Sequence, residues 1–126
     1  MAQLSLRIDF EPSGSAFGPG MAELLERVDK MGSIRQAAAS MEMSYRKAWL
    51  LLKGMQQTFG GAILVTETGG AAGGGAQLTE LGHRLIKSYR TIQAKATRAT
   101  EDEVKLLSEL VRDSAPPKRR VAPKGS

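Results

Sequence analysis

The stretch GSIRQAAASMEMSYRKAWLLLKGM, residues 32–55, decides the fold of this chain. It contains two serines, Ser33 and Ser44, each followed by a run of helical character, and serine is a preferred helix N-cap. We predict one helix over residues 34–40 and a second from Ser44 to about Thr58, joined by a tight link. Consecutive alanines in the first helix allow a close crossing, and polar and basic residues open the second. This order is typical of a helix-turn-helix.

The second helix is expected to have an inward and an outward face. Apolar residues at helical spacing predict the inward stripe, which comprises Ala48, Leu52, Met55 and Phe59. At about 100° per residue, the opposite side holds Arg46, Leu50, Lys53 and Gln57, with Lys47 and Trp49 beside it. Basic residues near the start of such a helix indicate contact with the major groove of DNA. The alternative is a plain helical hairpin with solvated lysines and arginines.

Periodicity predicts further elements on both sides of this motif. Apolar and polar residues alternate over residues 4–10, which predicts a strand followed by a turn. An amphipathic helix is predicted over residues 19–31. Beyond the helix-turn-helix, residues 62–67 and 76–78 are strand-like and enclose the glycine-rich loop 69–75. No lysine follows this loop, which argues against a nucleotide-binding phosphate loop and favours the wing of a winged helix.

A long helical region follows, and we expect Thr79 to cap it. Its apolar positions predict a seam for dimerisation, formed by Leu85, Tyr89, Ile92, Ala96 and Ala99. The alternative is that this helix packs back on its own domain. The run Thr100-Glu101-Asp102-Glu103 fits a capping box, so the helix is expected to break and restart there. We expect residues 1–115 to form one domain and the basic, proline-rich residues 116–126 to be a disordered tail.

Composition limits the classes of function. The chain has 126 residues and a net charge of +5, with basic blocks at residues 30–56 and 116–126. Such blocks favour nucleic acid as a partner. There is no cysteine and one histidine, His83, so we expect no metal site, no cofactor and no catalysis. The sequence shows no signal peptide and no apolar run of membrane-spanning length, which predicts a cytoplasmic protein without a membrane partner.

Several of these segments resemble the ModE family of molybdate-responsive transcription regulators. The similar segments are GSIRQAA (32–38), SYRKAW (44–49), ILV (63–65), TGG (68–70), GGGA (73–76) and LTELG (78–82). The resemblance implies an N-terminal winged helix-turn-helix domain and a homodimer that binds a palindromic operator. Members usually have C-terminal oxyanion-binding repeats. The 126 residues do not contain such repeats, so we expect that these residues do not respond to molybdate. Members also often have a basic residue in the wing, where this chain has Ala71 and Ala72.

The sequence thus predicts a mainly α fold with a small β-wing, a winged helix-turn-helix with a long C-terminal dimerisation helix. The predicted function is sequence-specific binding of double-stranded DNA by a homodimeric transcriptional regulator. The predicted DNA-binding residues are Ser33, Arg35, Gln36, Ser44, Tyr45, Arg46, Lys47, Lys53, Thr66, Thr68, Gly69 and Gly70. The alternative is a dimeric interaction adaptor of the same fold that acts with a separate sensor protein.

Overall fold

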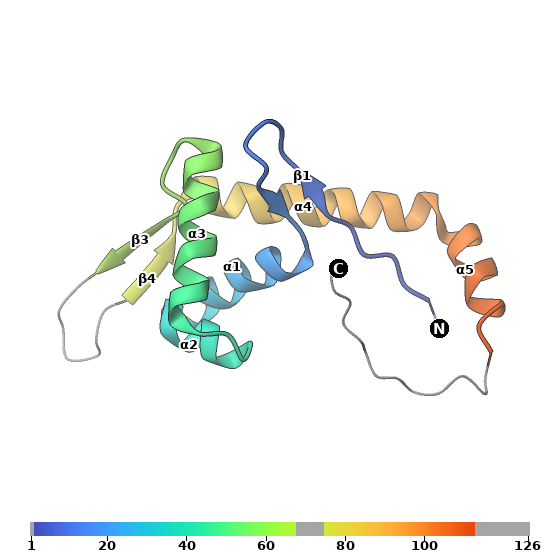
Figure 1. The fold of residues 1–126 in the computed structure, drawn as a ribbon, viewed down its shortest axis with the longest axis horizontal. Helices are drawn as coiled ribbons and strands as arrows, with labels where there is room; N and C mark the ends of the chain where they lie inside the picture. The colour runs from blue at the N-terminus through green and yellow to red at the C-terminus, as the bar shows by residue number, and fades with distance from the viewer. Residues whose placement is uncertain (1, 68–74, 113–126) are drawn as a thin grey trace. The chain divides into compact units, whose positions relative to one another are not determined.

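The structure is a computed structural model that describes residues 2–67 and 75–112. These residues belong to two compact units, Ser5–Ala94 and a smaller one made of the residues outside that range. In the described part, helices predominate and β structure is limited to two antiparallel pairs of strands (Figure 1). The predicted mainly α fold is confirmed, and the arrangement is consistent with a winged helix. The predicted domain boundary at residue 115 and the tail lie outside the described residues.

The N-terminal segment forms a small hairpin. Strand β1 (Ile8–Asp9) pairs with β2 (Ala16–Phe17), and Ile8 lies opposite Phe17. The predicted strand over residues 4–10 was therefore too long, and β2 lies in the segment that we predicted as a turn. The alternating burial is present over residues 4–10, but a strand also requires a partner backbone. Only Ile8 and Asp9, next to the tight turn, have such a partner.

Three helices follow and form the body of the larger unit. They are α1 (Pro19–Met31), α2 (Ile34–Ser40) and α3 (Tyr45–Phe59), close to the predicted bounds. Helix α1 ends at Gly32, whose φ of 70° is a left-handed conformation that suits glycine. Arg27 of α1 donates a hydrogen bond to the backbone oxygen of Ser40, at 3.1 Å, which connects α1 to the end of α2.

The second hairpin comes directly after α3. Strand β3 (Leu64–Glu67) pairs with β4 (Gly75–Leu78), and Leu64 lies opposite Leu78. Both strands were predicted, whereas the loop between them lies outside the described residues. The backbone N–H of Ala76 donates to the carbonyl oxygen of Gly32 at 2.9 Å. The start of β4 is thereby fixed against the end of α1.

Two helices complete the described chain, α4 (Glu80–Ala99) and α5 (Glu101–Glu109). The predicted cap of α4 is confirmed, because the N–H of Gly82 donates to Thr79 Oγ1 at 3.2 Å. The break between the helices is also confirmed, but the capping box is wrong. Thr100 Oγ1 donates to the carbonyl oxygen of Ala96 at 2.8 Å and does not cap α5. None of the helices in the described residues has the length and apolar character needed to cross a membrane.

Part of the predicted dimerisation seam lies inside the larger unit. Tyr89 is only 2% exposed, and its hydroxyl donates to the carbonyl oxygen of Leu6 at 2.6 Å. Burial raises the pKa of this tyrosine above its usual value. Leu85 packs against the same core, whereas Ile92 is 45% exposed. Tyr89 and Leu85 therefore stabilise their own domain, as the alternative interpretation of this helix expected.

An ion pair connects α1 to α4. The guanidinium of Arg90 donates to both carboxylate oxygens of Glu26, at 2.9 and 2.8 Å. These hydrogen bonds hold the pKa of Glu26 below its usual value and raise that of Arg90. Both side chains are more than a third exposed, so solvent screening limits the contribution of the pair to about 1 kcal/mol or less. The pair is thus a weak link between the two helices at the surface.

Helix α4 begins in close contact with the residue that precedes β3. A Cβ atom on Gly82 would lie 2.5 Å from the carbonyl oxygen of Ile63, well inside van der Waals contact. Ile63 itself is fully buried, and its carbonyl accepts the N–H of Thr79 at 2.9 Å. A side chain at position 82 would therefore separate α4 from the base of the β3–β4 hairpin.

We expect two of the helical glycines, Gly82 and Gly54, to respond oppositely to alanine. Gly82→Ala should destabilise the protein by about 1–3 kcal/mol, because the new methyl group collides with a backbone oxygen. Gly54→Ala is the matched control: its Cβ would meet nothing within 4 Å, and the better helix propensity should stabilise by up to about 1 kcal/mol. Urea denaturation of both variants tests this. Equal effects in the two variants would contradict the close approach at Gly82.

Candidate nucleic-acid interface

The start of α3 is shaped by two capping serines and the turn between them. Ser33 Oγ accepts the N–H of Gln36, and Ser44 Oγ accepts the N–H of Lys47, both at 3.0 Å. Both caps were predicted. Glu42 in the turn has a φ of 57°, in the left-handed region that costs a non-glycine residue roughly 1–2 kcal/mol. This conformation reverses the chain so that α3 begins at the surface.

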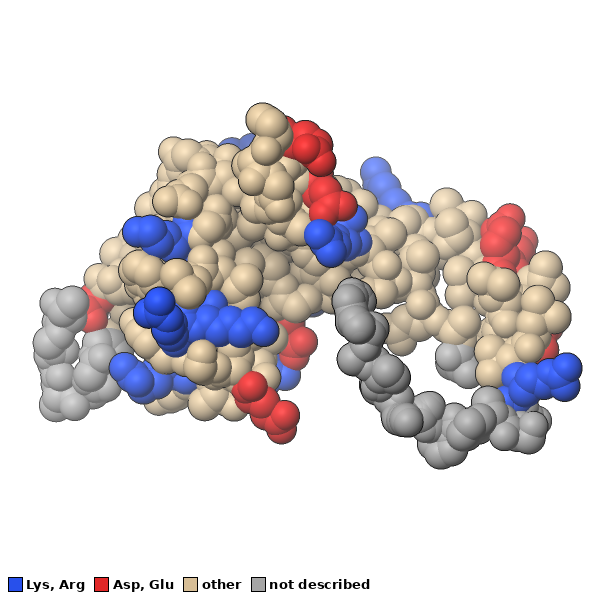
Figure 2. Space-filling model, viewed as in Figure 1, with Lys and Arg blue, Asp and Glu red and all other residues tan. Residues whose placement is uncertain are grey.

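The surface formed by α2 and α3 is basic. Between residues 33 and 66 the chain has four lysines or arginines and a single acidic residue, Glu42. The four cations are Arg35, Arg46, Lys47 and Lys53, and all of them are exposed. Figure 2 shows blue side chains gathered over this part of the molecule, with few red ones among them. A concentration of positive charge on one face attracts polyanions.

Two of the four cations of this surface lie over aromatic rings. The Arg35 guanidinium lies 4.5 Å from the centroid of the Tyr45 ring and connects the first turn of α2 to that of α3. The Lys53 ammonium lies 5.0 Å from the centroid of the Trp49 ring, one turn away on α3. Both rings are about 40% exposed, at 41% and 43%. Such contacts hold flexible cations in place at an exposed site, with about 0.5–1 kcal/mol each.

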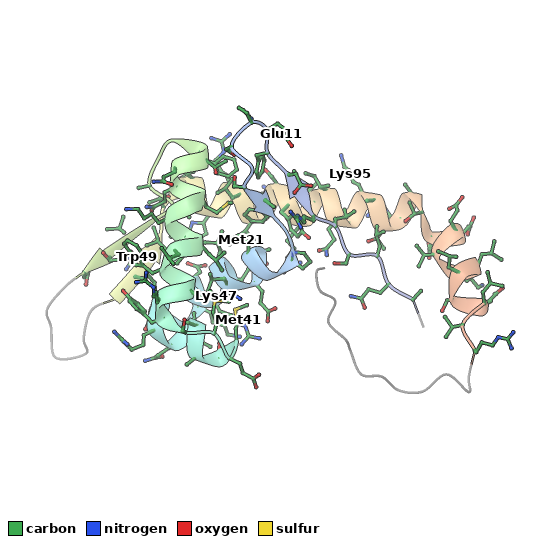
Figure 3. All side chains as sticks on the ribbon, in the orientation of Figure 1. Glu11, Met21, Met41, Lys47, Trp49 and Lys95 are labelled. Atoms are coloured by element: carbon green, nitrogen blue, oxygen red, sulfur yellow. The ribbon has the colours of Figure 1, made fainter. Side chains whose placement is uncertain are left out.

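Arg46 lies between two shallow hollows on α3. One, of about 340 Å³, is lined by Ser44, Arg46, Lys47, Leu50 and Leu51. The other, of about 220 Å³, is lined by Tyr45, Arg46 and Trp49. Figure 3 labels Lys47 and Trp49, which lie at the lower part of α3 in that view. Arg46 is thus the ridge of this surface, with an apolar depression on each side.

The β3–β4 hairpin is attached to the same helix. Gln56 Oε1 accepts the N–H groups of Ile63 and Leu64, at 3.0 and 3.4 Å. A third hollow, of about 200 Å³, lies between α3 and β3, and its lining includes Trp49, Lys53 and Thr66. The predicted contacts of the second helix and of the hairpin therefore meet along one surface.

The structure brings together most of the predicted DNA-binding residues. Ser33 and Ser44 are caps, while Arg35, Gln36, Tyr45, Arg46, Lys47, Lys53 and Thr66 are exposed on α2, α3 and β3. Thr68, Gly69 and Gly70 lie outside the described residues. Sequence reasoning missed Gln56, because its side chain bonds to backbone N–H groups at the start of the β3–β4 hairpin and not to its own helix. It also left Leu50 out of the candidate site, although the helical period had placed it on the outward face.

Sequence comparison with known proteins identifies relatives of this chain. No family model matches the chain. The chain is 32% identical over 110 residues to the molybdenum transport protein ModE of Azotobacter vinelandii, which covers 87% of the chain and 40% of that protein. It is 38% identical over 88 residues to the DNA-binding transcriptional dual regulator ModE of Escherichia coli, which covers 68% of the chain and 34% of that protein. The aligned region of this chain belongs to the ModE family.

A third ModE protein gives the same result. The transcriptional regulator ModE of Yersinia pestis is 36% identical over 96 residues, which cover 74% of this chain and 36% of that protein. The chain thus spans at most about two fifths of the length of these ModE proteins. The longest of these alignments covers 110 of the 126 residues, so it includes α2 and α3 wherever it begins. The resemblance to ModE in the helix-turn-helix segment is confirmed.

We expect Gln56 to hold the start of the β3–β4 hairpin against α3. Gln56→Leu removes the acceptor of two backbone N–H groups, so the amides of Ile63 and Leu64 should exchange with solvent at least several-fold faster. Gln57→Leu, at the exposed neighbouring position, is the matched control and should leave both amides unchanged. Hydrogen exchange followed by NMR measures this. Unchanged exchange at both amides in Gln56→Leu would show that the hairpin is held by other contacts.

Proposed function

We propose that this chain is a cytoplasmic, sequence-specific DNA-binding transcription regulator, and that α2, α3 and the β3–β4 hairpin act as a winged helix-turn-helix. The observation that supports this most is the outward face of α3, which is basic, has no acidic residue and begins at a capped, exposed N-terminus. The names of the ModE relatives, which describe transcriptional regulators, support the same class of function. The proposal requires no catalysis and no cofactor.

In this proposal α3 enters the major groove. Arg46 donates to base edges, since arginine pairs with the two acceptors of guanine. Tyr45, Ser44 and Lys47 contact bases or phosphates beside it, and Arg35 and Gln36 contact the backbone from α2. Lys53 and Thr66 contact the neighbouring phosphates, together with the wing residues Thr68, Gly69 and Gly70. The basic residues of 116–126 add attraction that does not depend on sequence.

The proposed regulator is a homodimer. A single winged helix contacts about half of a palindromic site, which seldom gives enough discrimination in a genome. Ile92 is an exposed isoleucine on α4, near Ala96 and Ala99, whose small side chains permit close helix contact. In the smaller unit, helix α5 exposes Leu106 and Leu107, and its C-cap residue Leu110 is exposed as well; a partner would cover these apolar side chains. We propose that these residues, and not Tyr89 or Leu85, form the contact between two copies.

We expect Arg46→Ala to weaken binding to the preferred DNA site by about 1–3 kcal/mol and to relax the sequence preference. Arg84→Ala, which removes an exposed arginine from α4, controls for the change in net charge and should leave the preference unchanged. A gel shift with duplexes selected from genomic fragments, repeated at several salt concentrations, measures both. Equal affinity of the wild type and Arg46→Ala for the best site would contradict the assignment of α3. Weak binding that is blind to sequence would instead favour the adaptor.

We expect Ile92→Asp to produce monomers with weakened operator binding, because a dimer contact would bury an unpaired charge at a cost of several kcal/mol. Thr91→Asp is the matched control, since it places the same charge at an exposed polar position of the same helix. Light scattering at tens of micromolar protein gives the mass of each variant. A wild-type monomer that binds a full palindrome without cooperativity would rule out the dimer.

A further inference from the structure

The centre of the basic surface holds an exposed leucine. Leu50 is 48% exposed and lies one turn after Arg46 on α3, so both side chains project from the same face of the helix. It lines the 340 Å³ hollow, whose wall also includes Lys47 and Leu51. Cationic and apolar side chains thus line the same depression on the exposed side of α3.

The chemistry of this depression indicates what would fill it. The lysine and arginine that line it would attract a negatively charged partner, and the two leucines would gain from an apolar group on that partner. Duplex DNA offers both, because thymine presents a C5-methyl group in the major groove between the two phosphate backbones. Among the four bases, thymine alone places an apolar group on this edge.

The position of Leu50 fits this partner. In the helical projection it lies at the middle of the outward face, almost opposite the buried Ala48, Leu52 and Met55. No acidic side chain on α2 or α3 opposes a phosphate on either side of it. Since Arg46 and Leu50 lie one turn apart on this face, an α3 that enters the groove with Arg46 at a base edge would carry Leu50 into the same groove.

We propose that Leu50 is a specificity-determining residue that recognises the methyl group of a thymine beside the base contacted by Arg46. The inference rests on the proposed DNA-binding function and adds a base preference to it. Contact of the Leu50 side chain with the methyl group removes both from water, and a base without that methyl group loses this contribution. The preferred half-site therefore contains a thymine at a fixed distance from the arginine contact.

The test removes single methyl groups from the DNA. A duplex that the wild-type protein selects from a random pool is synthesised with deoxyuridine in place of one thymine at a time, which leaves all hydrogen-bonding groups unchanged. At one thymine of each half-site the wild type should bind about four-fold more weakly to the uracil duplex, the effect of one buried methyl group. Leu50→Ala should bind the thymine and uracil duplexes equally at that position.

The controls separate this inference from the function on which it rests. Val65→Ala removes another exposed aliphatic side chain, on β3, and should retain the four-fold discrimination. Equal binding of thymine and uracil duplexes by the wild type at every position, or discrimination that persists in Leu50→Ala, overturns the inference. If Arg46→Ala still weakens binding in that case, the DNA-binding function stands. A Leu50→Ala variant that loses affinity for poly-glutamate but not for DNA would assign the hollow to an acidic protein segment and overturn it as well.

Discussion

The close packing of small side chains in the larger unit is the constraint on which the rest of its architecture depends. Ala22 of α1, Ala37 and Ala38 of α2, and Ala48 of α3 are all at most 1% exposed. Because these residues have only a methyl group, the helix backbones can approach closely, and interiors packed this densely adapt poorly to added volume. The direction of α3 follows from this contact. Any side chain that enlarged it would rotate the outward face and displace the arginine, the aromatic rings and the attached hairpin together.

Elements with strong local signals could be predicted from the sequence. The three helices of the larger unit, the caps at Ser33 and Ser44 and the positions of β3 and β4 follow from periodicity and from residues adjacent in the chain. The rest depends on contacts that the local sequence pattern does not show. Tyr89 has the spacing of a surface seam, but it is buried and its hydroxyl donates a hydrogen bond to Leu6, 83 residues earlier. Strand β2, the role of Gln56 and the true partner of Thr100 likewise appear only when the backbone positions are known.

The charges are divided between the faces of the larger unit. The acidic residues of α1 each have a basic neighbour: Glu23 pairs with Arg27, Glu26 with Arg90, and Asp29 Oδ1 lies 3.3 Å from His83 Nε2. Two of the four cations of α2 and α3 have aromatic neighbours instead: Arg35 lies over Tyr45 and Lys53 over Trp49. The arginines offset the charges of Glu23 and Glu26, whereas a ring leaves the charge of a cation intact. The field of the protein is therefore concentrated where α3 is exposed.

Trp49 has a further consequence, because it is the single tryptophan of the chain. Its indole lies on the outward side of α3, 43% exposed and beside the Lys53 ammonium. The emission of an indole depends on its contact with water and on nearby charge. The tryptophan fluorescence of the protein therefore originates from this surface alone. An unlabelled sample thus has its own optical probe on the exposed side of α3, sensitive to whatever displaces water from that side chain.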